Sequence, residues 1–350
     1  MRSVRKRVRI FGVALGALLV GGLAVVVPAA NAEQTVADDR QTAIVSLGDS
    51  AISGEGAGDY EPGTNGENGN WCHRSANALV HRTAVADRTF NLACSGADSA
   101  NVSLADTTHY TEGSQARRLI DIAREFRVTN VLVQVGANDD PAFADTMVDC
   151  ILAWFNPFGS DCRKDLADEW PQRLTAMAPK VEVAIADVKS AMSQAGYADG
   201  DYNLVLTSYA SPLTEQMDEI LHGPQGCPFR LDDAEFGRTV AVPQLSEALR
   251  GVATRTGVKF LDFSRGTEGH EACSGGGDSS TEWQNRVTVD PWAWVTGGLD
   301  AIGMHMAQQS FHPNARGHAQ LGTCVTEFVN TGADSAACVI GADGNLHAVQ

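Results

Sequence analysis

Ser50 stands where a nucleophile could act. It closes the triplet Gly48-Asp49-Ser50, which directly follows the apolar run 43–47. Val, Ile and Leu are typical of a strand buried on both faces, and a glycine lets the backbone turn sharply at the strand's end. In open α/β sheets the ligand crevice lies just beyond the carboxyl ends of the strands, so Ser50 is a candidate nucleophile. A serine after a strand is also a common helix N-cap, and the triplet alone favours that interpretation, so the residues downstream must decide.

Two further strand ends carry groups that could stabilise negative charge. Gly96 follows the run 89–93, and Asn138 follows the run 130–135. A glycine leaves its backbone N–H open to a ligand, and a side-chain amide donates a hydrogen bond without carrying charge. If the strands are parallel, all three residues meet at one edge of the sheet. Acyl transfer from an ester needs such a nucleophile, a nearby base and donors aimed at the developing oxyanion.

Four blocks in this order resemble the SGNH (GDSL) hydrolase superfamily, in particular the secreted actinomycete GDSL esterases and lipases. The similarity runs from about Ile44 to about Phe328, and its blocks are Gly48-Asp49-Ser50, Cys94-Ser95-Gly96-Ala97, Gly136-Ala137-Asn138-Asp139 and Phe311-His312-Pro313-Asn314. The resemblance implies that Ser50 is the nucleophile and His312 the general base. It further implies an oxyanion hole formed by the backbone N–H groups of Ser50 and Gly96 and the side chain of Asn138. No cofactor and no metal are implied.

One position departs from the superfamily. In many members an aspartate three residues before the histidine orients its ring, and here that position holds Gln309. A neutral amide cannot stabilise an imidazolium as a carboxylate does. Some secreted actinomycete relatives look as if they use a backbone carbonyl instead, so we expect the Gln309 carbonyl to orient His312 and the variant Gln309→Ala to keep most activity.

The order of predicted elements indicates an α/β fold. Apolar runs of strand length alternate with helical periodicity, which is typical of a parallel sheet covered by helices on both faces. With the resemblance, we expect a flavodoxin-like three-layer α/β/α sandwich with about five parallel strands. The expected strands begin near residues 43, 89, 130, 202 and 258, and the main expected helices span 114–126, 166–195 with an interruption near Pro179, 244–255, and a final helix ending near 330.

The first 32 residues read as a leader. Five basic residues precede an almost wholly apolar stretch, and Ala30-Asn31-Ala32 resembles a signal-peptidase site. The competing interpretation is a membrane anchor, because the apolar stretch approaches spanning length. We expect residues 1–32 to be a signal peptide, 33–42 a flexible arm, 43–330 the hydrolase domain and 331–350 a C-terminal tail. The mature product would be a secreted, soluble monomer without a stable membrane anchor.

Charge and cysteine count agree with export. Removal of the leader and its five basic residues takes the formal net charge from −17 to −22, which disfavours nucleic acid and anionic membranes as partners. The eight cysteines indicate disulfides, although eight allow 105 pairings. Pairing in sequence order is the simplest expectation: Cys72 with Cys94, Cys150 with Cys162, Cys227 with Cys273, and Cys324 with Cys338.

The sequence does not predict which acyl group or which alcohol the substrate contains. The apolar segment 151–158, flanked by Cys150 and Cys162, fits either a pocket wall stapled by a disulfide or a piece of core. We expect a secreted serine esterase or lipase that acts on a small-molecule or lipid ester. An acyltransferase using the same acyl-enzyme is the nearest alternative. A non-catalytic lipid- or carbohydrate-binding protein, with Trp292 and Trp294 stacking on sugars, is the alternative from another class.

Overall fold

The structure is a computed structural model that describes residues 39–287 and 308–350. The expected leader, most of the expected arm, Trp292 and Trp294 lie outside the described residues. No helix among the described residues is long and apolar enough to cross a bilayer.

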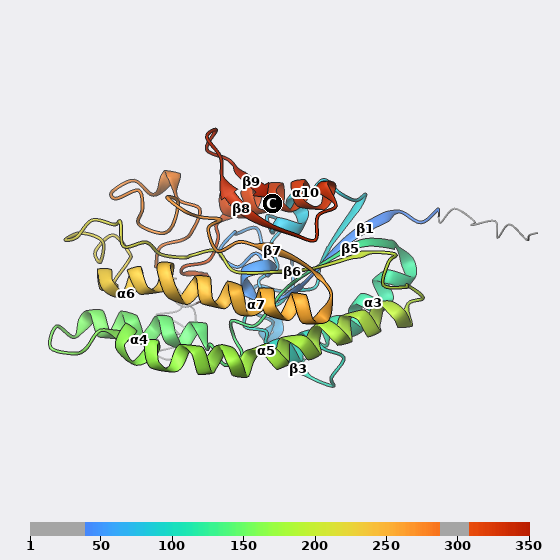
Figure 1. Ribbon diagram of the computed structural model, residues 1–350, viewed down its shortest axis with the longest axis horizontal. Helices are drawn as coiled ribbons and strands as arrows, with labels where there is room; N and C mark the ends of the chain where they lie inside the picture. Colours follow the sequence, from blue (N-terminus) through green and yellow to red (C-terminus); the bar gives the residue numbers. More distant parts are fainter. Residues whose placement is uncertain (1–38, 288–307) are drawn as a thin grey trace, which may run out of the picture. The chain divides into compact units, whose positions relative to one another are not determined.

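A seven-stranded sheet organises the described residues (Figure 1). Its spatial order is β2-β1-β5-β6-β7-β8-β9, with every neighbouring pair parallel except the antiparallel β8 and β9. The strands are β1 (Thr42–Gly48), β2 (Arg88–Asn91), β5 (Arg127–Gln134), β6 (Asn203–Thr207), β7 (Lys259–Asp262), β8 (Ser335–Ile340) and β9 (Leu346–Val349). β2 and β5 flank β1 on opposite sides, so the order in which strands are added to the sheet reverses at β1. In open α/β sheets, ligand crevices form where the strand order reverses.

Helices cover both faces of this sheet. One face carries α2 (Ser99–Val102), α3 (Gln115–Glu125), α5 (Cys162–Gln194) and α7 (Val242–Thr256). The other carries α1 (Ser50–Ser53), the 3₁₀ helix η2 (Leu79–Arg82) and α10 (Ala315–Thr331). The remaining elements are η1 (Glu67–Gly69), the small hairpin of β3 (Thr108–His109) and β4 (Glu112–Gly113), α4 (Phe143–Phe155), α6 (Leu231–Phe236), the π-helix η3 (Gly237–Ala241) and η4 (Ser279–Thr281). The expected three-layer α/β/α arrangement is confirmed.

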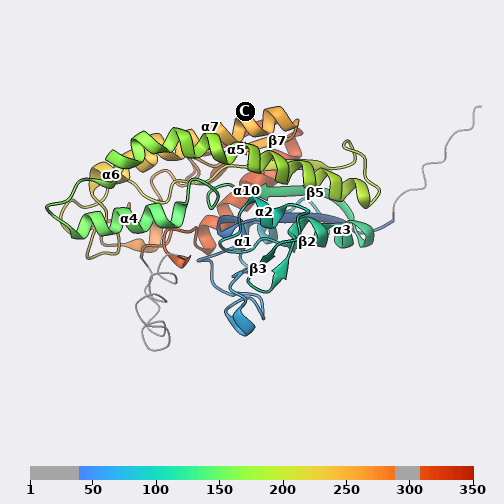
Figure 2. The same cartoon turned by 90° about the horizontal axis from the view of Figure 1, so that it is seen from below.

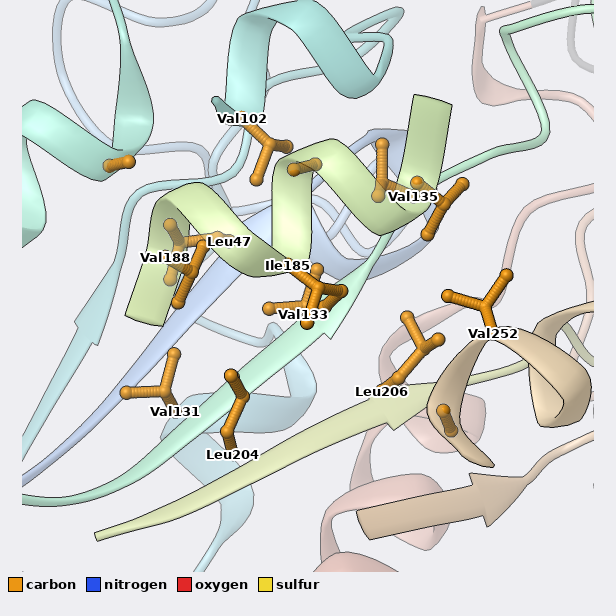
Figure 3. Close-up of a cluster of buried hydrophobic side chains, with 14 of the residues drawn as sticks. Leu47, Val102, Val131, Val133, Val135, Ile185, Val188, Leu204, Leu206 and Val252 are labelled. Carbon is orange, nitrogen blue, oxygen red and sulfur yellow. The ribbon is translucent and has the colours of Figure 1, made fainter. Parts of the chain in front are cut away.

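Alternation along β1 explains why its sequence is almost continuously apolar. Ala43, Val45 and Leu47 point into the core beneath α5, whereas Ile44 points into the core beneath α10. Strands with two buried faces need apolar side chains at odd and even positions alike. Figure 3 shows the first of these cores, where side chains of α5 lie over those of the strands: Ile185 and Val188 over Leu47, Val131 and Val133.

The sheet is larger than the sequence predicted. All five expected strands are present, but residues 331–350, expected as a tail, contribute β8 and β9. These strands are short, and β8 is built largely of small residues, so neither shows the apolar run that marks the central strands. The disulfide Cys324–Cys338 ties β8 to α10.

Helix α5 is longer than expected and continues through Pro171 and Pro179. A proline removes one backbone hydrogen bond and disfavours the preceding helical turn, which is why an interruption was expected. Here a buried face that includes Trp170, Met177 and Ile185 holds the helix against its neighbours α3 and α7 (Figures 1 and 2).

The four disulfides are those expected from sequence order: Cys72–Cys94, Cys150–Cys162, Cys227–Cys273 and Cys324–Cys338. Cys150–Cys162 joins α4 to the first turn of α5, so the apolar segment 151–158 lies within a stapled helical hairpin.

Candidate active site

Ser50 lies directly beyond the carboxyl end of β1. The backbone of Gly48 has a φ of 141°, and a Cβ atom there would lie 1.9 Å from the carbonyl oxygen of Gln134, so only glycine fits. The buried amide of Gln115 accepts a hydrogen bond from the Gly48 N–H at 2.7 Å and donates one to the Gly48 carbonyl at 2.8 Å. These contacts fix the point from which Ser50 projects.

The hydroxyl of Ser50 lies 2.7 Å from Nε2 of His312, although the two residues are 262 positions apart. His312 is almost buried, with 8% of its surface exposed. A hydroxyl can donate to an unprotonated ring nitrogen, so this contact suits proton transfer from Oγ to Nε2.

The other ring nitrogen of His312 contacts a different residue from the one expected. Its Nδ1 lies 3.0 Å from the backbone carbonyl of Ser310, two residues earlier, rather than from that of Gln309. A carbonyl only accepts, so the Nδ1 atom carries the hydrogen and the neutral ring presents a lone pair at Nε2 toward Ser50. The expectation of a carbonyl partner agrees with the geometry, but its assignment to Gln309 was wrong by one residue.

Gly96 and Asn138 lie at the same edge as Ser50. The Cys94 N–H donates to the Gly48 carbonyl at 3.0 Å, which places the segment containing Gly96 beside the end of β1. The Asn138 amide donates to the carbonyl of Ala97 at 3.0 Å, so the turns after β2 and β5 are joined directly. An amide nitrogen carries two hydrogens, and this bond uses one of them.

Comparison with known proteins identifies the fold and the family. The family model of the GDSL-like Lipase/Acylhydrolase family matches residues 46–320, which is most of the chain. This protein is a member of the GDSL-like lipase/acylhydrolase family. No curated protein sequence matches the chain significantly.

Two solved structures share the fold of this GDSL family member. An extracellular lipase from Streptomyces rimosus is 21% identical, with a TM-score of 0.58 over 83% of this chain and 100% of that one. A phospholipase A1 from Streptomyces albidoflavus is 20% identical, with a TM-score of 0.54 over 83% of this chain and 99% of that one. At such identities the likeness establishes the architecture, and the chemistry must come from this chain's own residues.

A pair formed by the buried carboxyl of Asp49 and the partly buried phenol of Tyr209 lies behind Ser50. The Tyr209 hydroxyl donates to Asp49 Oδ2 at 2.5 Å and accepts from the Ala137 N–H at 3.2 Å. The other carboxyl oxygen of Asp49 accepts from the Ala51 N–H, which caps α1. Burial raises the pKa of Asp49 to about 7, with the Tyr209 and Ala51 hydrogen bonds opposing the shift. Tyr209 therefore links the Ser50 turn to the turn that carries Asn138.

Asn285 holds the loop that carries His312. Its backbone forms two hydrogen bonds with this loop. Its carbonyl accepts from the Phe311 N–H at 2.9 Å, and its N–H donates to the His312 carbonyl at 2.9 Å. Phe311 has a φ of 60°, unusual for a bulky residue, and its ring packs edge-on against Phe229 at 5.1 Å. Packing and hydrogen bonds together hold this strained backbone, which aims His312 at Ser50.

An apolar cavity of about 120 Å³ opens beside Ser50 and His312. It runs between α4, α5 and α7, and the apolar residues that line it include Phe143, Met147, Leu166, Trp170, Leu245 and Phe311. The disulfide Cys150–Cys162 also lines it, so the segment flanked by these cysteines is attached to the pocket wall. Apolar cavities of about 150 Å³ hold a molecule as large as benzene, so this one can take several carbons of a hydrocarbon chain.

Sequence reasoning missed Gln115, Tyr209, Asn285 and Ser310 as members of the site. Each acts through a contact between segments far apart in the chain, except Ser310, whose role depends on the local turn. Within the described residues 39–287 and 308–350, no group of three or more His, Cys, Asp or Glu side chains is arranged to hold a metal ion.

Proposed function

We propose that this protein is an exported serine hydrolase of carboxylic esters, with Ser50 as nucleophile and His312 as general base. The observation that carries the proposal is the 2.7 Å contact between Ser50 Oγ and His312 Nε2. The Ser310 carbonyl supports it, because it keeps the hydrogen on Nδ1 and leaves Nε2 free to accept the serine proton.

In the first half-reaction, Ser50 Oγ attacks the ester carbonyl carbon while its proton passes to His312 Nε2. The carbonyl π-electrons move to oxygen and form a tetrahedral oxyanion. When the oxyanion collapses, the bond to the alcohol oxygen breaks and the His312 imidazolium returns its proton to that oxygen. The alcohol leaves, and the acyl group remains on Ser50 as an ester.

In the second half-reaction, His312 takes a proton from water as the water oxygen attacks the acyl carbon. Collapse of the second oxyanion breaks the bond to Ser50 Oγ, which recovers its proton from His312, and the carboxylic acid departs. The net reaction consumes one ester and one water and yields one alcohol and one acid.

Three donors would hold the oxyanion: the backbone N–H groups of Ser50 and Gly96 and the side chain of Asn138. Ser50 occupies the first turn of α1, where backbone N–H groups have no partner within the helix. The Asn138 amide is already oriented by Ala97 and can donate its second hydrogen. Loss of one such donor typically lowers kcat by about 100- to 1000-fold.

The apolar cavity supports an acyl group of several carbons as the buried half of the substrate. Its lining between α4, α5 and α7 offers hydrocarbon contacts and few polar ones. The two Streptomyces proteins of the same fold are a lipase and a phospholipase A1, which agrees with an acyl ester substrate. Export is supported by the leader-like residues 1–32 and by four disulfides, which persist in oxidising compartments.

Hydrolysis of p-nitrophenyl esters of increasing chain length tests the proposal. Each methylene group buried in the cavity should raise kcat/KM about fourfold, until the cavity is filled and the increase stops. Ser50→Ala should abolish hydrolysis of every ester in the series. Hydrolysis at the wild-type rate by folded Ser50→Ala would refute the role of Ser50, and equal rates for acetate and longer esters would refute the acyl pocket.

A further inference from the structure

A buried carboxylate–imidazole pair lies close to His312 and is not used by the proposed reaction. The carboxylate of Glu55 and the imidazole of His73 are both almost fully buried, with Oε2 2.6 Å from Nδ1. Burying a carboxylate is costly unless it is paired and hydrogen-bonded, so its presence here calls for a physical reason.

Aromatic rings enclose this pair. The Tyr60 hydroxyl lies 3.3 Å from Oε1 of Glu55, and its ring stacks on His73 at a centroid distance of 4.5 Å. The Trp71 ring packs against His73 in an edge-on arrangement, with a centroid distance of 5.7 Å. The carboxylate is thus held in one position in a water-poor environment, where its electric field is screened less than at the surface.

The backbone beside Glu55 is fixed against His312. A Cβ atom on Gly56 would lie 3.3 Å from the Cβ of His312, so the two backbones are in close approach. Asn285 joins them, because its side chain donates to the Gly56 carbonyl at 2.8 Å and its N–H donates to the His312 carbonyl at 2.9 Å. The segments that carry Glu55 and His312 are therefore tied to each other.

His73 leaves the charge on Glu55 in place. Its Nδ1 faces the carboxylate, whereas its buried Nε2 has no hydrogen-bond partner among the described residues. An N–H at that buried atom would be left without an acceptor, so the neutral ring with hydrogen on Nδ1 fits best. The pair then carries one net negative charge.

The surroundings of His312 act on its pKa in opposite directions. Burial lowers the pKa of His312, and the Glu55 carboxylate and the hydrogen bond to the Ser310 carbonyl oppose that shift, whereas His73, as a neutral ring, contributes no charge. From α10, His318 also lies near, but burial lowers the pKa of His318 to about 3, so it stays neutral in the working range. Glu55 is thus the negative charge that can compensate an imidazolium at position 312, where the orienting Ser310 carbonyl is uncharged.

We propose that Glu55, held by His73 and Tyr60, is a positioning residue that stabilises the His312 imidazolium formed during ester hydrolysis. It would supply through space the negative charge that a neutral residue at position 309 cannot supply. This inference rests on the proposed function, because an imidazolium arises only if His312 acts as the base.

The decisive experiment is the pH profile of kcat/KM for Glu55→Gln, measured from about pH 4 to 9 on a p-nitrophenyl ester. Loss of the charge should weaken His312 as a base, so the acidic limb should move down by about one pH unit and the plateau should fall about tenfold. Glu55→Asp keeps the charge and should leave the acidic limb within about 0.3 pH unit of the wild type.

Glu61→Gln is the matched control, because Glu61 lies on the same loop region but is partly exposed and pairs with Arg74. Its profile should match the wild type. An unmoved acidic limb in Glu55→Gln, or equal behaviour of Glu55→Gln and Glu55→Asp, would overturn the proposal. Failure of Glu55→Gln to fold by circular dichroism would also overturn it, since the charge would then serve folding.

These outcomes are separable from failure of the proposed function. If wild-type protein hydrolyses esters and Ser50→Ala does not, the hydrolase assignment stands whatever Glu55→Gln does. If Ser50→Ala retains full activity, both proposals fail.

Discussion

The Nδ1 atom of His312 lies 3.0 Å from the backbone carbonyl oxygen of Ser310, in the position where a triad would have a carboxylate. Because the acceptor belongs to the main chain, no side-chain substitution removes it. The carbonyl oxygen of Gln309 lies beside Gly56, where a Cβ atom would be 3.2 Å from it. Orientation of the base therefore depends on the backbone turn 309–312.

Gln309→Ala should keep activity within about threefold of the wild type, because its side chain is not the partner of the His312 ring. Steady-state kinetics on one p-nitrophenyl ester measure this. His312→Ala serves as the reference for loss of the base. A loss in Gln309→Ala that approaches the loss in His312→Ala would show that the glutamine side chain takes part.

The acidic limb of the pH profile should lie below the ordinary histidine pKa of about 6.5. Burial lowers the pKa of His312, so the ring stays neutral, and able to accept a proton, to lower pH than an exposed histidine. Activity should be fully present above that limb and fall as the pH drops through it. A kcat/KM profile of the wild type gives the value, and a limb well above pH 6.5 would contradict the account.

Tyr209→Phe should lower both stability and kcat. It would leave the buried Asp49 carboxyl and the Ala137 N–H without their shared partner, at a cost of about 1–3 kcal/mol in the free energy of unfolding. Because Ala137 directly precedes Asn138, the proposed oxyanion donor should also be displaced, which lowers kcat more than it raises KM. Urea unfolding and steady-state kinetics measure the two effects.

Tyr202→Phe is the control for this prediction. Tyr202 and Tyr209 flank opposite ends of β6, so only Tyr209 lies at the edge that carries Ser50. Tyr202→Phe should leave kcat unchanged. Equal kinetic losses in both variants would indicate a general effect on the sheet rather than a role for Tyr209 at the site.

Removal of the Cys150–Cys162 disulfide should alter substrate preference. In the double variant Cys150→Ala/Cys162→Ala, α4 is no longer fastened to α5, so the cavity wall loosens and longer acyl chains lose more kcat/KM than acetate does. The free energy of unfolding should fall by about 2–4 kcal/mol.

The variant Cys324→Ala/Cys338→Ala removes a disulfide between α10 and β8, outside the cavity lining. It should lower stability by a similar amount without changing the ratio of rates between long and short esters. A change of that ratio in both variants alike would argue against a specific role for the α4–α5 staple.

The sequence predicts the central part of this fold because its signals are local and strong. Each of the five expected strands is marked by an apolar or β-rich run, and glycine-containing turns follow β1, β2 and β5. The four blocks fix which turns carry Ser50, Gly96, Asn138 and His312. β8 and β9 were not predicted, because β8 is built largely of small residues and the edge strand β9 is largely half-exposed, so neither carries that signal.

The supporting contacts of the site could not be predicted from the sequence, because they join segments that only the folded chain brings together. Tyr209 meets Asp49 across 160 positions, and Gln115 meets Gly48 across 67. The carbonyl that contacts His312 belongs to Ser310 rather than Gln309 because of the turn at Phe311. Phe311 has a positive φ, which a bulky aromatic residue gives no reason to expect. The sequence therefore predicted which motif residues form the site, but not the residues that hydrogen-bond to them.

Active-site labelling with a fluorophosphonate tests the central claim most directly. The reagent should react with one residue, and mass spectrometry of the peptides should place the adduct on Ser50. Folded Ser50→Ala should not be labelled, and His312→Ala should be labelled far more slowly because Ser50 has lost its base. An unlabelled wild-type protein, or a label on another residue that persists in Ser50→Ala, would contradict the account.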